Sequence, residues 1–118
     1  MKRWLIVAAI GGFLWVTLGA ATGHGVLLGQ EATWFEKAQR YHIVHVLALL
    51  WLAATQTSRF LWVAYFWVAG VVCFSGSLYL MSLVTGWSSL RFITPIGGVC
   101  FLLGWAVLMG LLWREGRK

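Results

Sequence analysis

Residues 60–90 read FLWVAYFWVAGVVCFSGSLYLMSLVTGWSSL and contain no Lys, Arg, Asp or Glu. A helix that crosses a lipid bilayer needs about 20 consecutive, mostly apolar residues. Lipid offers the backbone no hydrogen-bonding partner, so a spanning segment must be a helix or a strand of a closed barrel. Barrel strands are short and alternate in polarity, whereas this run is continuously apolar. The stretch therefore predicts a transmembrane helix at residues 60–83.

Three further stretches share this character. Charged residues are also absent from residues 4–30, 41–58 and 92–113. We therefore predict four helices, at residues 4–22, 38–56, 60–83 and 93–113. Residues 31–39 could also form a helix that runs into the second of these. The expected fold is all-α, an integral membrane four-helix bundle in a single membrane domain that covers residues 1–118.

The composition of the whole chain also indicates a membrane protein. Of its 118 residues, 61% are hydrophobic and 10% are charged, whereas soluble domains carry about 25% charged residues. Because small domains leave much of their surface exposed, a soluble fold of this length could not hide so much apolar surface. These values exclude a soluble enzyme, a disordered tail and a nucleic-acid-binding domain.

The nine basic residues predict the orientation of the bundle. Four spans place both termini on one side, which then carries Lys2, Arg3, Arg59, Arg114, Arg117 and Lys118. Cytoplasmic loops are enriched in Lys and Arg, so we predict cytoplasmic termini and a multi-pass protein of the cell inner (cytoplasmic) membrane. The apolar run after Lys2 and Arg3 also resembles a signal peptide. It is long for one, however, and we expect the first helix to be retained.

Polar side chains gather at the other, outer end of the predicted bundle. They are His24, Arg40, Tyr41, His42, His45, Ser75, Ser77, Tyr79 and Thr94. Polar groups inside a membrane are costly and mark either function or helix pairing. Our first interpretation is a structural polar cluster, in which these residues hydrogen-bond across helices.

The three histidines allow a second interpretation. His42 and His45 are three residues apart and share one helix face, and His24 could approach them from its loop. Such a group is a weak candidate for a Zn or Cu site, because no Cys or carboxylate stands at a matching spacing. A proton or quinone role for the histidines is a third interpretation.

Tryptophans mark the predicted membrane boundaries, as in the aromatic belts of membrane proteins. Four of the nine tryptophans lie deeper: Trp15, Trp51, Trp67 and Trp105. We interpret these four as packing bulk or as lipid-facing side chains.

Several short segments together resemble one known family. They are GAATGHG at residues 19–25, Phe35-Glu36, RYHIVHVLALL at 40–50, FSGSLY at 74–79, ITPIGG at 93–98 and LGW at 103–105. In this order they span essentially the whole chain and resemble the domain-of-unknown-function 423 family of small inner-membrane proteins. The resemblance implies a four-helix membrane protein and no particular activity. The family pattern commonly has Gln where this chain has His42, so a role that depends on His42 is not family-wide.

These observations favour a non-catalytic integral membrane protein that acts as a partner-binding or accessory subunit of a membrane complex. Its expected partners are the lipid bilayer and other membrane proteins or a second copy of itself, without nucleic acid and without a cofactor. We predict no catalytic residue, because the chain has no Asp to orient a Ser–His pair. The alternative is a small transporter or a metal- or quinone-binding protein that uses the histidines, and a membrane enzyme is a third hypothesis.

Overall fold

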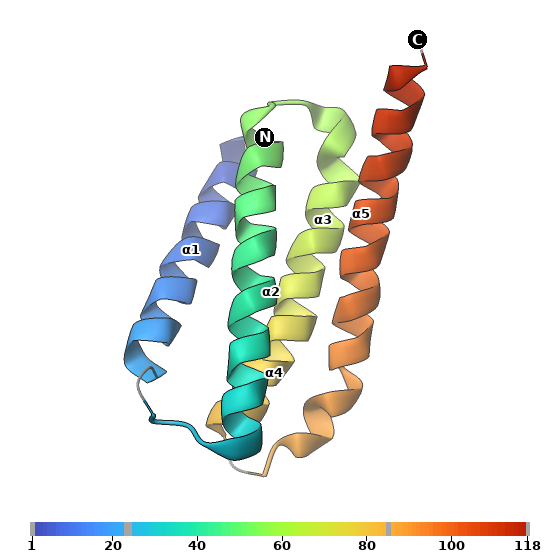
Figure 1. Cartoon of the computed structure of the whole chain (residues 1–118). Coiled ribbons are helices and arrows are strands. Elements are labelled where there is room, and N and C mark those ends of the chain that lie inside the picture. The colour runs from blue at the N-terminus through green and yellow to red at the C-terminus, as the bar shows by residue number, and fades with distance from the viewer. Residues whose placement is uncertain (1, 23–24, 85, 118) are drawn as a thin grey trace.

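The computed structural model describes residues 2–22, 25–84 and 86–117 (Figure 1). Within these residues every regular element is helical, which confirms the all-α prediction. In chain order the elements are α1 (Lys2–Thr22), α2 (Gly29–Ala54), η1 (Ser58–Phe60), α3 (Leu61–Gly70), η2 (Val71–Ser75), α4 (Gly76–Leu83), η3 (Ser88–Phe92) and α5 (Thr94–Gly116). The short elements η1 and η3 are 3₁₀ helices, and η2 is a π-helix.

The elements form four long segments, because η1, α3, η2 and α4 follow one another as one rod (Figure 1). Helix α1 packs against α2, and the third segment packs against both α2 and α5. The start of α1 and the end of α5 lie at the same end of the bundle, at the top of Figure 1. We name this the terminal end, and we name the opposite end, where α2 and α5 begin, the loop end.

Helix α2 starts earlier than predicted. It begins at Gly29 rather than at residue 38, and it lies alongside the other helices as a full member of the bundle. Residues 30–54 contain no Gly or Pro that would interrupt a helix. Glu31 lies in the first turn, where a carboxylate interacts favourably with the helix dipole. The prediction relied on the absence of charged residues. That absence shows which residues can face lipid, but a helix can begin in a polar stretch before them.

Three segments are long and apolar enough to cross a membrane, namely Lys2–Thr22, Ser58–Leu83 and Ser88–Gly116. Within the described residues α2 is not one of them, because the charged residues in its first half lower its mean hydropathy. The most polar of the four segments is therefore the one that packs against both α1 and the third segment.

Glycines allow α5 to approach the third segment closely. A Cβ on Gly97 would lie 2.2 Å from the backbone nitrogen of Phe74, which is part of η2. A Cβ on Gly104 would lie 2.4 Å from Cδ1 of the Trp67 indole. Small residues at such crossings are typical of helix pairs in membranes, where close van der Waals packing drives association.

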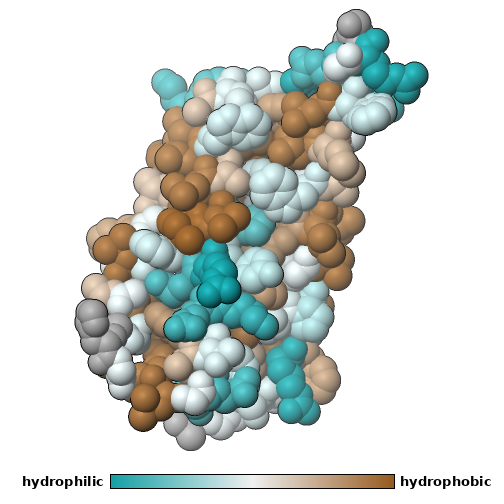
Figure 2. Space-filling model, viewed as in Figure 1, coloured by the Kyte–Doolittle hydropathy of each residue, from teal (hydrophilic) through white to brown (hydrophobic). Residues whose placement is uncertain are grey.

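The surface is mainly apolar, with two hydrophilic ends. In addition, Figure 2 shows hydrophilic side chains over the loop-end half of α2. Helix α1 is the most exposed span, since only 6% of its apolar window is buried. Its outer face is therefore covered in the membrane by lipid or by another protein.

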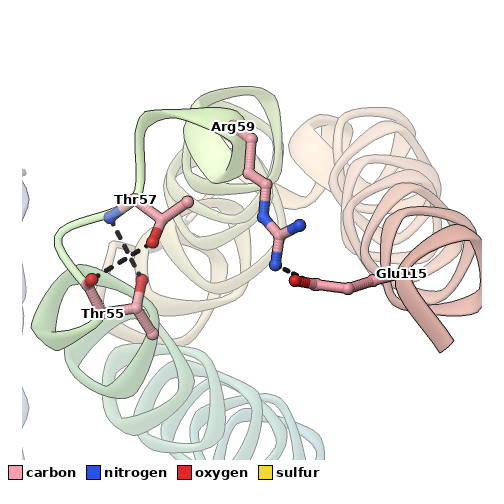
Figure 3. A network of polar contacts seen from close by, with 4 residues as sticks. All are labelled: Thr55, Thr57, Arg59 and Glu115. Atoms are coloured by element: carbon pink, nitrogen blue, oxygen red, sulfur yellow. Dashed lines mark hydrogen bonds and ion pairs between the residues drawn. The ribbon is translucent and has the colours of Figure 1, made fainter. Parts of the chain in front are cut away.

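A polar network ties two segments together at the terminal end (Figure 3). Arg59 of η1 forms an ion pair with Glu115 of α5. In the preceding turn, the backbone N–H of Thr57 donates to the Thr55 hydroxyl over 3.4 Å, and the Thr57 hydroxyl donates to the Thr55 carbonyl over 3.2 Å. Exposed ion pairs contribute about 0–1 kcal/mol to the free energy of unfolding, so the Arg59–Glu115 pair adds little stability. The two threonine hydrogen bonds hold the turn.

Candidate functional site

A chain of hydrogen bonds connects α1, α2 and α4. The Gln39 amide nitrogen donates to the Tyr79 hydroxyl over 2.8 Å and to the Trp15 carbonyl over 3.3 Å. The Tyr79 hydroxyl lies 2.7 Å from Nδ1 of His42, and Nε2 of His42 lies 2.9 Å from the Gly11 carbonyl oxygen. The Trp15 indole N–H donates back to the Gln39 carbonyl over 2.9 Å. Three segments are thereby joined through buried or half-buried polar groups.

The partners of His42 determine which of its nitrogens carries the proton. A carbonyl oxygen only accepts hydrogen bonds, so Nε2 is protonated and donates to Gly11. Nδ1 then accepts from the Tyr79 hydroxyl, whose oxygen in turn accepts from the Gln39 amide. Every donor and acceptor in this series of hydrogen bonds therefore has a partner when the His42 imidazole is neutral.

His45 has its own set of partners, which join α2 to α5. Its Nδ1 lies 2.8 Å from the Tyr41 carbonyl oxygen, one turn earlier on α2. The Trp105 indole N–H donates to its Nε2 over 3.0 Å. Because Trp105 only donates, Nε2 is unprotonated and Nδ1 carries the proton. The two histidines are thus held in opposite neutral tautomers.

Aromatic rings surround His45. Its ring stacks on Phe101, with centroids 3.7 Å apart and an interplanar angle of 11°. Trp67 meets the same ring edge-on at 6.0 Å and packs against Trp105 at 4.6 Å. Trp67 is 1% exposed, and among the described residues its indole N–H is the buried side-chain group that lacks a hydrogen-bond partner. The surroundings of His45 are therefore aromatic and largely buried.

Serine hydroxyls also make contacts between helices, around η2 and α4. Ser75, the last residue of η2, donates to the Ala38 carbonyl over 2.9 Å. The hydroxyls of Ser77 and Thr94 lie 2.6 Å apart and join α4 to the start of α5. These contacts fix the π-helical segment η2 against α2 on one side and the first turn of α4 against the start of α5 on the other.

The predicted polar residues form separate groups rather than one cluster. The groups are His42 with Tyr79, His45 with Tyr41, Ser77 with Thr94, and Ser75 with the backbone of α2. Arg40 is exposed and lies apart from these contacts. The predicted contribution of His24 lies outside the described residues.

The sequence analysis did not predict three residues that take part in these hydrogen bonds, namely Gln39, Trp15 and Trp105. Gln39 stands one helical turn before His42, a spacing that places both on one face. Interpreting Trp15 and Trp105 as packing bulk or lipid-facing side chains was incomplete, because both donate hydrogen bonds across helices. The available signal was chemical, since a buried indole N–H usually finds an acceptor.

The residues described contain no group of three His, Cys, Asp or Glu side chains that could hold a metal ion. Both ring nitrogens of His42 and of His45 already have partners within 3.0 Å. A metal bound to either ring would therefore have to displace an existing hydrogen bond.

An apolar cavity of about 380 Å³ lies beside the network, between α1, α2 and the third segment. Leu14 and Leu18 of α1 line one wall. His42, His45 and Tyr79 line the other with little exposed polar area. The cavity could accept an apolar molecule, and it offers that molecule few free polar groups.

Residues 18–98 match a family model described as a protein of unknown function, DUF423. The UPF0382 inner membrane protein YgdD of Escherichia coli (strain K12) is 42% identical, over 97% of this chain and 92% of the relative. A UPF0382 membrane protein of Haemophilus influenzae is 34% identical, over 91% of this chain and 90% of its own. The UPF0382 membrane protein SAB0533 of Staphylococcus aureus is 36% identical, over 92% and 93%. No solved structure matches the chain.

The family match and the relatives agree with the sequence resemblance. Together with the three apolar helices, the relatives place the protein in the inner membrane. The chain belongs to the DUF423 family of membrane proteins of unknown function.

Proposed function

We propose that the protein is a non-catalytic membrane protein that binds other membrane proteins, as an accessory subunit of a membrane complex. One observation carries the proposal: the ring nitrogens of His42 and His45 are all used in hydrogen bonds that join the helices. The two imidazoles, the side chains most suited to catalysis, are thus used to hold the helices together. We therefore assign the function to the surface of the bundle, where it can contact a partner protein.

The outer face of α1 is the surface we propose for the partner. Ile6, Ile10 and Phe13 are 62%, 55% and 71% exposed, and their spacing places them on one helix face. Helix α1 packs mainly on α2, so this face is free to meet a helix of another protein. Apolar helices associate in lipid through close packing of this kind.

Photo-crosslinking in living cells tests the proposal. A crosslinking amino acid at Phe13 is expected to give one adduct of defined mass with another membrane protein, identified by mass spectrometry. Leu102 on α5 is 70% exposed and serves as the matched control, at which the adduct should be absent. Identical patterns at both positions, or adducts with lipid alone, would contradict an accessory role for this face. Two differently tagged copies distinguish a foreign partner from a second copy.

We also propose that the terminal end faces the cytoplasm. Arg59 and Arg114 lie at this end with Lys2 and Arg3, and Lys and Arg concentrate on the cytoplasmic side of membranes. A reporter fused after Lys118 should be active when it is one that works in the cytoplasm. Activity of a periplasmic alkaline phosphatase at that position would reverse the topology.

The cavity beside His42 and His45 supports a second candidate, a quinone-binding protein. It combines an apolar wall with two imidazoles and a phenol. Titration of the purified protein with a short-chain quinone should then shift the tryptophan fluorescence saturably. A quinone carbonyl would compete with His42 for the Tyr79 hydroxyl, so Tyr79→Phe should weaken binding. Absence of saturable binding would rule out quinone binding, and only the partner-binding proposal would remain.

A further inference from the structure

A notch lined by both apolar and charged residues opens on the surface of the protein between α1 and α2. Its volume is about 550 Å³. Trp15 and Gly19 of α1 and Ile43 of α2 provide apolar wall, and Glu36 and Arg40 of α2 provide charge. Figure 2 shows hydrophilic side chains over the loop-end half of α2, where residues 36–40 lie. The notch is distinct from the cavity beside His42, which α1 and α2 share with the third segment.

The two charges are available to a ligand. Glu36 and Arg40 are four residues apart in the order that favours an ion pair on a helix. In the part of the chain that the structure describes, they do not pair with each other. Both side chains are exposed and both line the notch. The site therefore presents one anion and one cation, a helical turn apart.

The notch lies in the loop-end third of α1, within reach of the lipid headgroups from the tail region. The hydrogen bonds between Trp15 and Gln39 set these two residues level with each other. Trp15 stands seven residues before the end of α1, at Thr22, which is about 10 Å at the rise of an α-helix. A long arginine side chain can cover the remaining distance to the headgroup layer by extending along the protein surface.

We propose that this notch binds a phospholipid whose headgroup carries a phosphate and a primary ammonium, as in phosphatidylethanolamine. The Arg40 guanidinium donates to the phosphate oxygens, with the fork geometry that suits this group. The Glu36 carboxylate accepts from the ammonium, and the apolar wall at Trp15 and Ile43 contacts the first methylenes of the tails. This goes beyond the proposed accessory role, because the ligand is a lipid and the surface differs from the outer face of α1.

The two charges predict selectivity among headgroups. A choline headgroup has no N–H to donate to Glu36, and a glycerol headgroup has no cation. A serine headgroup adds a carboxylate, which Glu36 repels. Because exposed ion pairs contribute up to about 1 kcal/mol, we expect a preference of about three- to fivefold for the ethanolamine lipid over the choline and glycerol lipids.

Native mass spectrometry of the purified full chain tests this directly. The protein is equilibrated with equal amounts of ethanolamine, choline and glycerol phospholipids that have the same tails. The wild type should retain the ethanolamine lipid preferentially, and Arg40→Gln should retain less of every phospholipid. Glu36→Gln should lose the preference for ethanolamine over choline. Lys37→Gln is the matched control, since Lys37 is exposed on the same helix turn and does not line the notch.

Two further arms make the test decisive. Glu36→Lys places two cations at the notch and should reverse the preference toward the glycerol lipid. Free phosphoethanolamine, the same headgroup without tails, should not displace the bound lipid, and displacement would assign the notch to a soluble ligand instead. Circular dichroism verifies that each variant is folded, and if Arg40→Gln does not fold, the two Glu36 variants carry the test. Equal retention of all lipids by the wild type, or a Lys37→Gln effect equal to that of Glu36→Gln, would overturn the proposal.

Discussion

The α1–α2 and α3–α5 interfaces are the two most extensive helix pairings of the bundle, and they are built differently. The first contains hydrogen bonds between Trp15 and Gln39 in both directions and one from His42 to the Gly11 carbonyl. The second packs Gly104 against Trp67, whose buried indole N–H has no partner among the described residues. Glycines allow close contact in both pairs, at Gly11 and Gly19 of α1 and at Gly104 of α5, but among the described residues hydrogen bonds join the two helices only in the first pair.

The difference follows from the membrane as a solvent. Lipid tails are as apolar as leucine side chains, so burial against another helix supplies little driving force there. Helix α1 buries little of its surface and needs hydrogen bonds to fix its register on α2. Helix α5 instead packs closely against the third segment, where Gly104 contacts the Trp67 side chain of α3 and Gly97 approaches the Phe74 backbone of η2. Substitutions should therefore have their largest effects at the packed interface and smaller ones at the bonded interface.

The largest effect is expected from Gly97→Ala. The added Cβ would lie 2.2 Å from the Phe74 backbone nitrogen, so η2 and α5 must separate. Overpacking of this kind costs about 1–3 kcal/mol or more of the free energy of unfolding. Steric-trap unfolding in bicelles measures the loss. Gly110→Ala is the control, because nothing lies within 4 Å of its added Cβ, and equal stability of the two variants would refute the packing account.

An intermediate effect is expected from His42→Leu, which removes the bonds to Tyr79 and Gly11. Interhelical hydrogen bonds in membranes average about 0.6 kcal/mol, so the loss should be about 1 kcal/mol. His42→Gln should lose less, because an amide can still donate to one of these partners. A double-mutant cycle with Tyr79→Phe isolates the pair. Strict additivity of the two single changes would show that this hydrogen bond contributes nothing.

The smallest effect is expected from Trp105→Phe, which keeps most of the ring packing and removes one bond to His45. The expected loss is about 0.6 kcal/mol, the average for one such bond. Thermal unfolding in detergent should separate it from Trp113→Phe, a control at a position 68% exposed on the same helix. If the two variants unfold alike, the Trp105–His45 bond does not stabilise the bundle.

The main features of the fold were readable from the sequence. The uncharged run at residues 60–90 predicted a helix, and the structure places Ser58–Leu83 there as one continuous rod. The first residue of α2 could not be predicted from the distribution of charged residues, because residues 29–37 form a helix although several of them are polar or charged. The π-helical segment η2 also left no signal, since its residues are as apolar as their neighbours.

The candidate site was only partly predictable. The histidines, the serines and Tyr79 stand out in the sequence because polar residues are rare in apolar spans. Their pairing depended on side-chain directions, which separate His42 and His45 into different networks. Gln39, Trp15 and Trp105 complete those networks, and nothing in their spacing alone distinguishes them from surface or packing residues.

The hydrogen-bond partners of His42 and His45 hold the two rings neutral and in opposite tautomers. Nitrogen NMR of the protein labelled with ¹⁵N-histidine tests this assignment most directly, with His24→Gln as the background so that two rings remain. We expect two non-exchanging neutral rings, one protonated at Nε2 (His42) and one at Nδ1 (His45), and both nitrogen signals of the Nε2-protonated ring should be lost in His42→Gln. Two rings of the same tautomer, or charged or metal-bound rings, would contradict it.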